Sequence, residues 1–278
     1  MKSKIFIFIL SALVLAAAGP EGGDIPNANV SGAGYTAANG AIAQIGAEAY
    51  VAAALINAAT DEAAVQIGAP VESDIPVRLP REEFESLLNR NKDVIGRISI
   101  EGTKIDYPVL YDGAHYYLNH DIDHNKVTAG SIYLDPSNNP ERDDLHYLIH
   151  GHNMKNGTMF KDIVKYKNES FFYKNRLIRF DTLYDDMVWE VFSVYVLDAA
   201  KETIFTDYMG SEALYRLFLE KYAEKSMYAV EGIEFIADDR ILTLSTCSYE
   251  TPNSRTIVHA RLIYKNGVQA IAPTINLR

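Results

Sequence analysis

Short runs of hydrophobic residues alternate with turn-forming residues from residue 94 onward. The runs are rich in β-branched and aromatic residues, and Gly, Pro, Asn and Asp separate them, which is typical of β-strands. Many short strands of this kind predict a mainly β fold, either a barrel or a sandwich. We expect the strands at residues 94–100, 105–110, 131–134, 145–150, 177–180, 187–197, 240–246 and 255–264, with a terminal piece near Val268.

Two segments instead carry hydrophobic residues at the spacing of a helix. Residues 81–91 place Phe84 and Leu87 on one side, with acidic residues in the first turn. Residues 211–222 repeat leucine and aromatic residues at the same interval, and the Ser211 hydroxyl can cap this helix. We therefore expect helices at the periphery of the β fold.

The N-terminal part of the chain differs in composition and in hydrophobic pattern. Residues 1–19 begin with two lysines, continue as an apolar run and end in small residues, which is the order of an export signal. The apolar run is shorter than the ~20 residues that span a bilayer, so a retained membrane anchor and a cleaved signal peptide both stay open. Residues 20–78 are rich in Ala, Gly, Asn and Pro and predict a linker or stalk, with an alanine-rich helix at 41–59. We expect residues 79–278 to form an extracellular domain on a single N-terminal membrane anchor, or a secreted domain if the signal is cleaved.

Charge and cysteine content narrow the function. The chain has 26 Lys and Arg against 37 Asp and Glu, a net charge of −11, which would repel a phosphate backbone and argues against a nucleic acid partner. The one cysteine, Cys247, excludes an intrachain disulfide and a two-cysteine redox pair. It is either a small buried hydrophobic residue or a nucleophile.

Cys247 lies where an apolar run ends, and Arg255 opens the next run. Side chains alternate along a strand, so Thr243, Ser245 and Cys247 share one face. A hairpin would bring the Arg255 guanidinium close to the Cys247 sulfur. The alternative is a surface arginine that blunts the end of a strand.

Histidine is the natural proton carrier for such a thiol, because its pKa lies near neutrality. His146, His150 and His152 fall on one side if their strand persists. Together, Cys247, His152 and Arg255 would supply a nucleophile, a proton donor and a stabiliser for a developing oxyanion. Three histidines also form a possible zinc site, but no nearby acid completes a metal motif. We expect no metal and no organic cofactor.

These residues resemble the motifs of sortases, in particular those of class B. Residues 243–250, Thr-Leu-Ser-Thr-Cys-Ser-Tyr-Glu, together with Arg255 look like the active-site strand and arginine of that family. Residues 150–160 resemble its histidine segment. Residues 105–109, 116–118 and 130–135 also fit, and the resemblance extends over about residues 81–277.

The resemblance implies a closed eight-stranded β-barrel with an added helix before the seventh strand, and a cysteine transpeptidase. Cys247 would attack the threonine carbonyl of a sorting signal on a surface protein, and Arg255 would hold the oxyanion. His152 would protonate the leaving amine, and Ser245 and Thr246 would line the substrate groove.

The implied partners are a sorting-signal peptide, an amine of a lipid II-type peptidoglycan precursor, and the membrane through the N-terminus. Two alternatives stay open: a secreted cysteine peptidase that uses the same residues with water as acceptor, and a non-catalytic surface β-barrel with a buried, inert cysteine.

Overall fold

The computed structural model describes residues 78–142, 144–204, 211–271 and 273–274. The predicted signal or anchor at 1–19 and the predicted stalk helix at 41–59 lie outside these residues. Across the part of the chain that is described, no helix has both the length and the apolar character needed to cross a bilayer.

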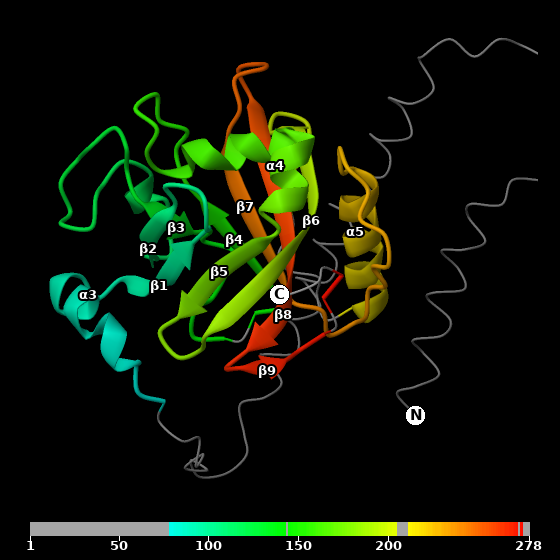
Figure 1. The fold of residues 1–278 in the computed structure, drawn as a ribbon. Coiled ribbons are helices and arrows are strands. Elements are labelled where there is room, and N and C mark those ends of the chain that lie inside the picture. The colour runs from blue at the N-terminus through cyan, green and yellow to red at the C-terminus, as the bar shows by residue number, and fades with distance from the viewer. Residues whose placement is uncertain (1–77, 143, 205–210, 272, 275–278) are drawn as a thin grey trace, which may run out of the picture. The chain divides into compact units, whose positions relative to one another are not determined.

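A closed β-barrel dominates the described residues (Figure 1). The strands follow one another in space as β6-β5-β1-β2-β3-β4-β7-β8-β9, and β6 also pairs with β8. That pairing closes β1 to β8 into a ring and leaves β9 as a short edge strand on β8. The strands are β1 Val94–Ser99, β2 Asp106–Leu110, β3 Ile132–Leu134, β4 His146–His150, β5 Leu177–Thr182, β6 Met187–Asp198, β7 Ile241–Cys247, β8 Ser254–Lys265 and β9 Val268–Gln269. The predicted eight-stranded barrel is therefore confirmed.

Both predicted helical segments within the described residues are helical. The first consists of η1 (Glu82–Phe84) and α3 (Glu85–Arg90). The second is α5 (Glu212–Glu224), which precedes β7 in the chain, and the Ser211 hydroxyl accepts a hydrogen bond from Leu214 N at its N-terminus. The hydrophobic spacing therefore predicted both elements correctly, and the predicted Ser211 cap is present on the second.

In the described part of the chain, three further helical elements carry too weak a pattern to be predicted. They are η2 (Tyr116–Leu118), η3 (Phe160–Lys167) and α4 (Glu169–Lys174). Each is a short helix or a 3-10 helix, so hydrophobic residues do not repeat at α-helical spacing over several turns. Asn168 caps α4 by accepting a hydrogen bond from Phe171 N.

The two faces of β7 are buried in different ways. Leu242 and Leu244 point into the barrel and join its core. On the outer face, Ile241 belongs to a second buried cluster, which includes Leu219 and other residues of the helix α5. Every residue of β7 before Cys247 is buried as a result, and the strand becomes partly exposed only at Cys247.

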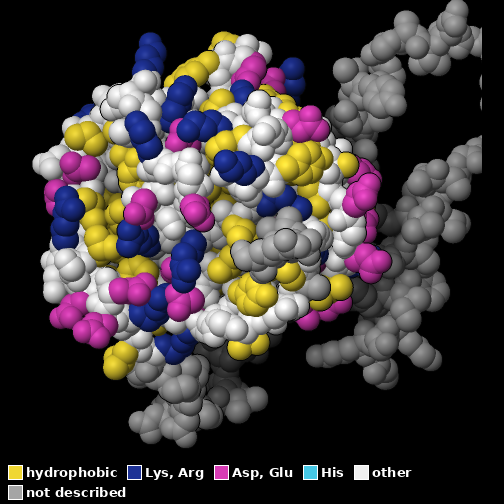
Figure 2. All heavy atoms as spheres, in the orientation of Figure 1, with side chains coloured by type: hydrophobic (Ala, Val, Ile, Leu, Met, Phe, Trp, Pro, Cys, Tyr) yellow, Lys and Arg dark blue, Asp and Glu magenta, His cyan; other side chains and the backbone are white. Residues whose placement is uncertain are grey.

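Positive and negative side chains are intermingled on the face drawn in Figure 2. Lys and Arg lie next to Asp and Glu, with hydrophobic side chains between them. This face offers no extended basic surface for a phosphate backbone, in line with the net charge of −11.

Candidate active site

The hairpin of β7 and β8 brings Cys247 and Arg255 together. The two residues are direct partners in the antiparallel ladder, so their side chains lie on the same face, with Cβ atoms about 4.5–5.5 Å apart. Arg255 Nη1 donates to the Ser254 carbonyl at 3.1 Å, and Ser248 N donates to the same carbonyl at 2.9 Å. One carbonyl therefore fixes both arms of the hairpin, which lies at the top of Figure 1.

The strand β4 delivers His152 to the same place. β4 runs parallel to β7 as far as the pair His150–Ser245, and Gly151 N then donates to the Ser245 carbonyl at 3.2 Å. A Cβ atom on Gly151 would lie 2.4 Å from Ile132 Cδ1 and 2.7 Å from Phe160 Cγ. Only glycine fits this close approach, which lets His152 continue alongside the end of β7.

The hydrogen bonds of His152 define its tautomer. Nε2 lies 2.7 Å from the Leu118 carbonyl oxygen, and because a carbonyl can only accept, Nε2 carries the hydrogen. Nδ1 is then the ring nitrogen left to meet the Cys247 thiol. A hydrogen bond between imidazole and thiol raises the pKa of His152, and the Leu118 carbonyl acts in the same direction.

The same contact acts on the thiol. The hydrogen bond with His152 lowers the pKa of Cys247, and the positive charge of Arg255 adds to this effect against the opposing effect of burial. The residue is partly exposed, so a reagent or substrate can reach it. A lowered pKa at a reachable thiol is the environment of a nucleophile, and the alternative of a buried, inert cysteine does not fit.

The two residues predicted to line the groove lie on opposite faces of β7. Ser245 shares the face of Cys247 and is 7% exposed. Thr246 is 2% exposed, and its hydroxyl donates to the Gly151 carbonyl at 2.7 Å. Thr246 thus links the two segments that carry Cys247 and His152. Direct contact of either residue with substrate stays a prediction.

Several residues at the site were not singled out from the sequence. The Leu118 carbonyl, which orients His152, is a backbone group and leaves no residue-type signal. Tyr133 lies close enough for Arg255 and Cys247 to act on its hydroxyl, and burial raises its pKa to about 12. Tyr133 lies on β3 and pairs with His150 of β4, two residues before His152. A correct prediction of the β3–β4 pairing could therefore have placed Tyr133 near the site.

Asn153 and Tyr249 were also missed. Asn153 Nδ2 donates to the Cys247 carbonyl at 2.8 Å, and the Tyr249 hydroxyl donates to the Asn153 carbonyl at 2.9 Å. Asn153 directly follows His152 in the sequence, and Tyr249 lies two residues after Cys247. Their partners are backbone carbonyls, so only the fold reveals the contacts.

The three histidines considered for zinc do not converge. His146 Nε2 lies 2.6 Å from Thr243 Oγ1 in the buried layer beneath α5. His150 Nε2 lies 2.7 Å from Asp135 Oδ2, and His152 faces Leu118 and the thiol. Each imidazole has its own partner, which leaves no shared position for a metal ion.

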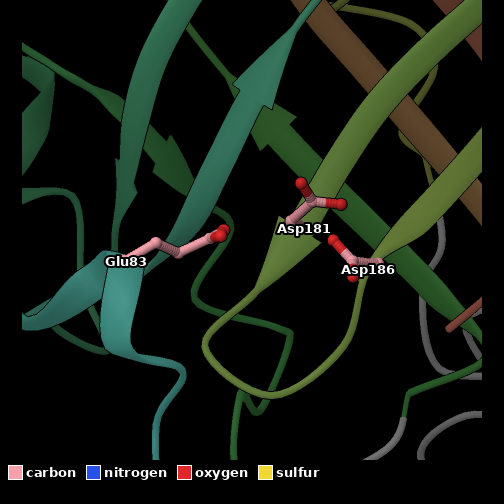
Figure 3. Close-up of side chains that lie close together, drawn as sticks. All are labelled: Glu83, Asp181 and Asp186. Atoms are coloured by element: carbon pink, nitrogen blue, oxygen red, sulfur yellow. The ribbon is translucent and has the colours of Figure 1, made fainter.

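A cluster of three acidic side chains lies away from the candidate active site, and its carboxylate oxygens are close enough together to hold a metal ion. Carboxylate oxygens of Glu83, Asp181 and Asp186 lie within 4.8 Å of one another, and Figure 3 shows the two aspartates facing each other across the β5–β6 turn. Arg81 Nη2 lies 2.6 Å from Asp186, and Arg179 lies 3.0 Å from Asp181 and 3.2 Å from Asp186. The guanidinium groups supply the counter-charge, so this cluster is an ion-pair network on the surface of the barrel.

Comparisons with known proteins find relatives of this chain. The family model of the sortase domain matches residues 98–263. Sortase B of Staphylococcus aureus is 34% identical over 186 residues, which cover 66% of this chain and 75% of that protein.

Solved structures extend the comparison to the fold. The structure of Clostridium perfringens sortase B is 37% identical, with a TM-score of 0.61, and covers 64% of this chain and 98% of its own. A Staphylococcus aureus sortase B–substrate complex is 32% identical, with a TM-score of 0.62, and covers 69% of this chain and 88% of its own. The chain therefore belongs to the sortase family of cysteine transpeptidases, and within that family to class B.

Proposed function

We propose that this sortase cleaves the C-terminal sorting signal of surface proteins after threonine, through a thioester on Cys247, and transfers the protein to an amine of a peptidoglycan precursor. The observation that carries the proposal is the meeting of three groups at one partly exposed thiol. Cys247 and Arg255 are ladder partners, and His152 shares a hydrogen bond with the sulfur that lowers the pKa of Cys247.

Acylation uses each group in turn. The Cys247 thiolate attacks the threonine carbonyl, and the C–S bond forms as negative charge moves to the carbonyl oxygen. Arg255 donates to that oxygen, since its guanidinium has further N–H groups besides the one on the Ser254 carbonyl, which also accepts the single N–H of Ser248. His152 then gives its Nδ1 proton to the leaving amine, the C–N bond breaks, and the thioester remains.

Deacylation uses the same three groups, with the proton moving in the opposite direction. The incoming amine loses a proton to Nδ1 of His152 as it attacks the thioester carbonyl. Arg255 again holds the oxyanion, and the C–S bond breaks to return the Cys247 thiolate beside the imidazolium. The Leu118 carbonyl keeps the proton on Nε2 throughout, so Nδ1 is the nitrogen that exchanges protons.

The proposed location follows from the sequence pattern at the N-terminus. Residues 1–19 would anchor the chain in the cell membrane, or act as a cleaved signal, and the barrel would face outward where surface proteins and peptidoglycan precursors meet. Ser245 would contact the bound signal peptide from the Cys247 face of β7.

Product analysis tests the proposal. The full chain is incubated with a panel of threonine-containing sorting-signal peptides, with and without triglycine as the amine acceptor. We expect the amine to divert the product from the free acid to the amide, and Cys247→Ala to abolish both products. Release of free acid alone, insensitive to the amine, would indicate the secreted peptidase instead. Turnover by the Cys247→Ala variant would reject the mechanism.

A further inference from the structure

The segment that carries His152 is held against the Cys247 turn mainly by side chains. The backbone ladder between β4 and β7 ends at the pair His150–Ser245. Beyond it, one backbone bond from Gly151 reaches the Ser245 carbonyl, and the Thr246 hydroxyl returns a bond to the Gly151 carbonyl. The distance between imidazole and sulfur is therefore not set by regular sheet geometry.

Two more side-chain hydrogen bonds connect the same two segments beyond His152 and Cys247. Asn153, directly after His152, donates through Nδ2 to the carbonyl of Cys247 itself at 2.8 Å. Tyr249, two residues after Cys247, donates through its hydroxyl to the Asn153 carbonyl at 2.9 Å. The backbone of His152 thus lies between anchored neighbours, Gly151 on one side and Asn153 on the other.

The exposures of the two residues indicate what their contacts are for. Asn153 is 4% exposed, so its amide acts in a place shielded from water. Tyr249 is 71% exposed, and its ring contributes little to the core. A tyrosine held open to solvent by one hydrogen bond to a loop backbone contributes to the position of that loop more than to hydrophobic stability.

We propose that Asn153 and Tyr249 are positioning residues that clamp the His152 loop to the Cys247 turn and so keep the imidazole within hydrogen-bond reach of the sulfur. The proposal rests on the roles given above to His152 and Cys247. A proton moves between two groups only when they meet at about 2.6–3.2 Å, so a loop that drifts by an ångström loses this step. Neither residue needs to touch substrate.

Alkylation of the thiol tests the clamp directly, because Cys247 is the only cysteine and any modified sulfur is its own. The rate constant for iodoacetamide is measured against pH on the full chain. The matched control is Tyr173→Phe, since Tyr173 is also exposed, at 48%, and its hydroxyl also donates to a backbone carbonyl, that of Ala229, at 3.0 Å.

We expect Tyr249→Phe to move the pH midpoint of alkylation upward, because the thiol loses part of its contact with His152. The rate at neutral pH should fall about two- to tenfold, the equivalent of one ordinary hydrogen bond. Turnover of a sorting-signal peptide should lose kcat with KM unchanged. Asn153→Leu should have a larger effect in the same direction, and Tyr173→Phe should match the wild type.

The outcomes separate the clamp from the proposed function. If Tyr249→Phe keeps the wild-type pH midpoint of alkylation, the clamp is overturned. If that midpoint is unchanged and KM for the peptide rises, Tyr249 is a substrate contact and not a positioning residue. If the wild-type thiol itself titrates like a free cysteine, the proposed function fails first. If Asn153→Leu does not fold, Tyr249→Phe alone decides, because it removes one hydroxyl from an exposed ring.

Discussion

Arg255 offers the sharpest test of the site, because its charge and its hydrogen-bonding shape can be removed separately. Arg255→Gln removes the charge and shortens the donor, whereas Arg255→Lys keeps the charge and loses the planar fork of two donors. The structure gives each change a distinct consequence, since Arg255 lies beside both Cys247 and His152 and is braced on the Ser254 carbonyl.

The loss of rate follows from the oxyanion. Ser248 N, directly after Cys247, already donates to the Ser254 carbonyl at 2.9 Å, whereas the Arg255 guanidinium has further N–H groups besides the one on that carbonyl and is the donor proposed for the oxyanion. Removing one such donor typically costs about 10²–10³-fold in kcat, or about 2.7–4 kcal/mol of transition-state stabilisation. We expect a loss of this size for both Arg255→Gln and Arg255→Lys.

The pH dependence distinguishes the two variants. The charge of Arg255 lowers the pKa of Cys247 and also lowers the pKa of His152. Removing the charge therefore raises both pKa values, and both limbs of the bell-shaped profile of kcat/KM move to higher pH. This sign holds for the coupled pair as a whole, because a nearby positive charge disfavours every added proton. Arg255→Lys keeps a charge and should leave the limbs near their wild-type positions.

The assay is the pH profile of kcat/KM with a fluorogenic sorting-signal peptide, measured for the wild type and both variants. Circular dichroism of each variant serves as the control for folding. A Gln variant that keeps the wild-type rate would contradict the oxyanion role of Arg255. A profile that stays in place or moves to lower pH would contradict the electrostatic account.

Two further substitutions test the scaffold of the site. Gly151→Ala forces a methyl group against Phe160 and should lower the free energy of unfolding by about 1–3 kcal/mol, measured by urea denaturation, together with a loss of kcat; unchanged stability would refute the close approach. Asp135→Asn tests a carboxylate whose pKa burial raises, but which hydrogen bonds from His150 and Ser137 bring down to about 2 from an ordinary 3.8. Because this pKa is depressed in the folded state, the wild type should be more stable than Asp135→Asn above pH 3.8, and the difference should disappear as the pH falls toward 2. A difference in urea midpoint that is the same at every pH would contradict this.

Alternating hydrophobic residues and turn residues were enough to predict the eight barrel strands, because each strand buries at least one face against the core. The outer face of β7 could not be predicted in the same way. Its burial depends on tertiary packing, because Ile241 lies in one buried cluster with Leu219 of α5, and the residue pattern of β7 does not show which element covers that face. The short helices η2, η3 and α4 were missed, since too few turns are present for a helical period to show.

The same division holds for the site. That Cys247, His152 and Arg255 lie together could be predicted, because their side-chain chemistry is distinctive and their motifs resemble those of sortases, and their catalytic roles stay predictions. Asn153 and Tyr249 act on backbone carbonyls, which no residue pattern encodes. The predicted domain start at residue 79 and the N-terminal anchor stay predictions.

The most direct test of the central claim is mass spectrometry of the acyl-enzyme. The full chain is mixed with a sorting-signal peptide, quenched with acid and digested, and the fragment that contains Cys247 is weighed before and after addition of hydroxylamine. The account predicts a mass increase equal to the substrate portion that ends in threonine, located on Cys247 and removed by the amine as a hydroxamate. An adduct on another residue, or peptide cleavage with no adduct on Cys247 under conditions that trap thioesters, would contradict it.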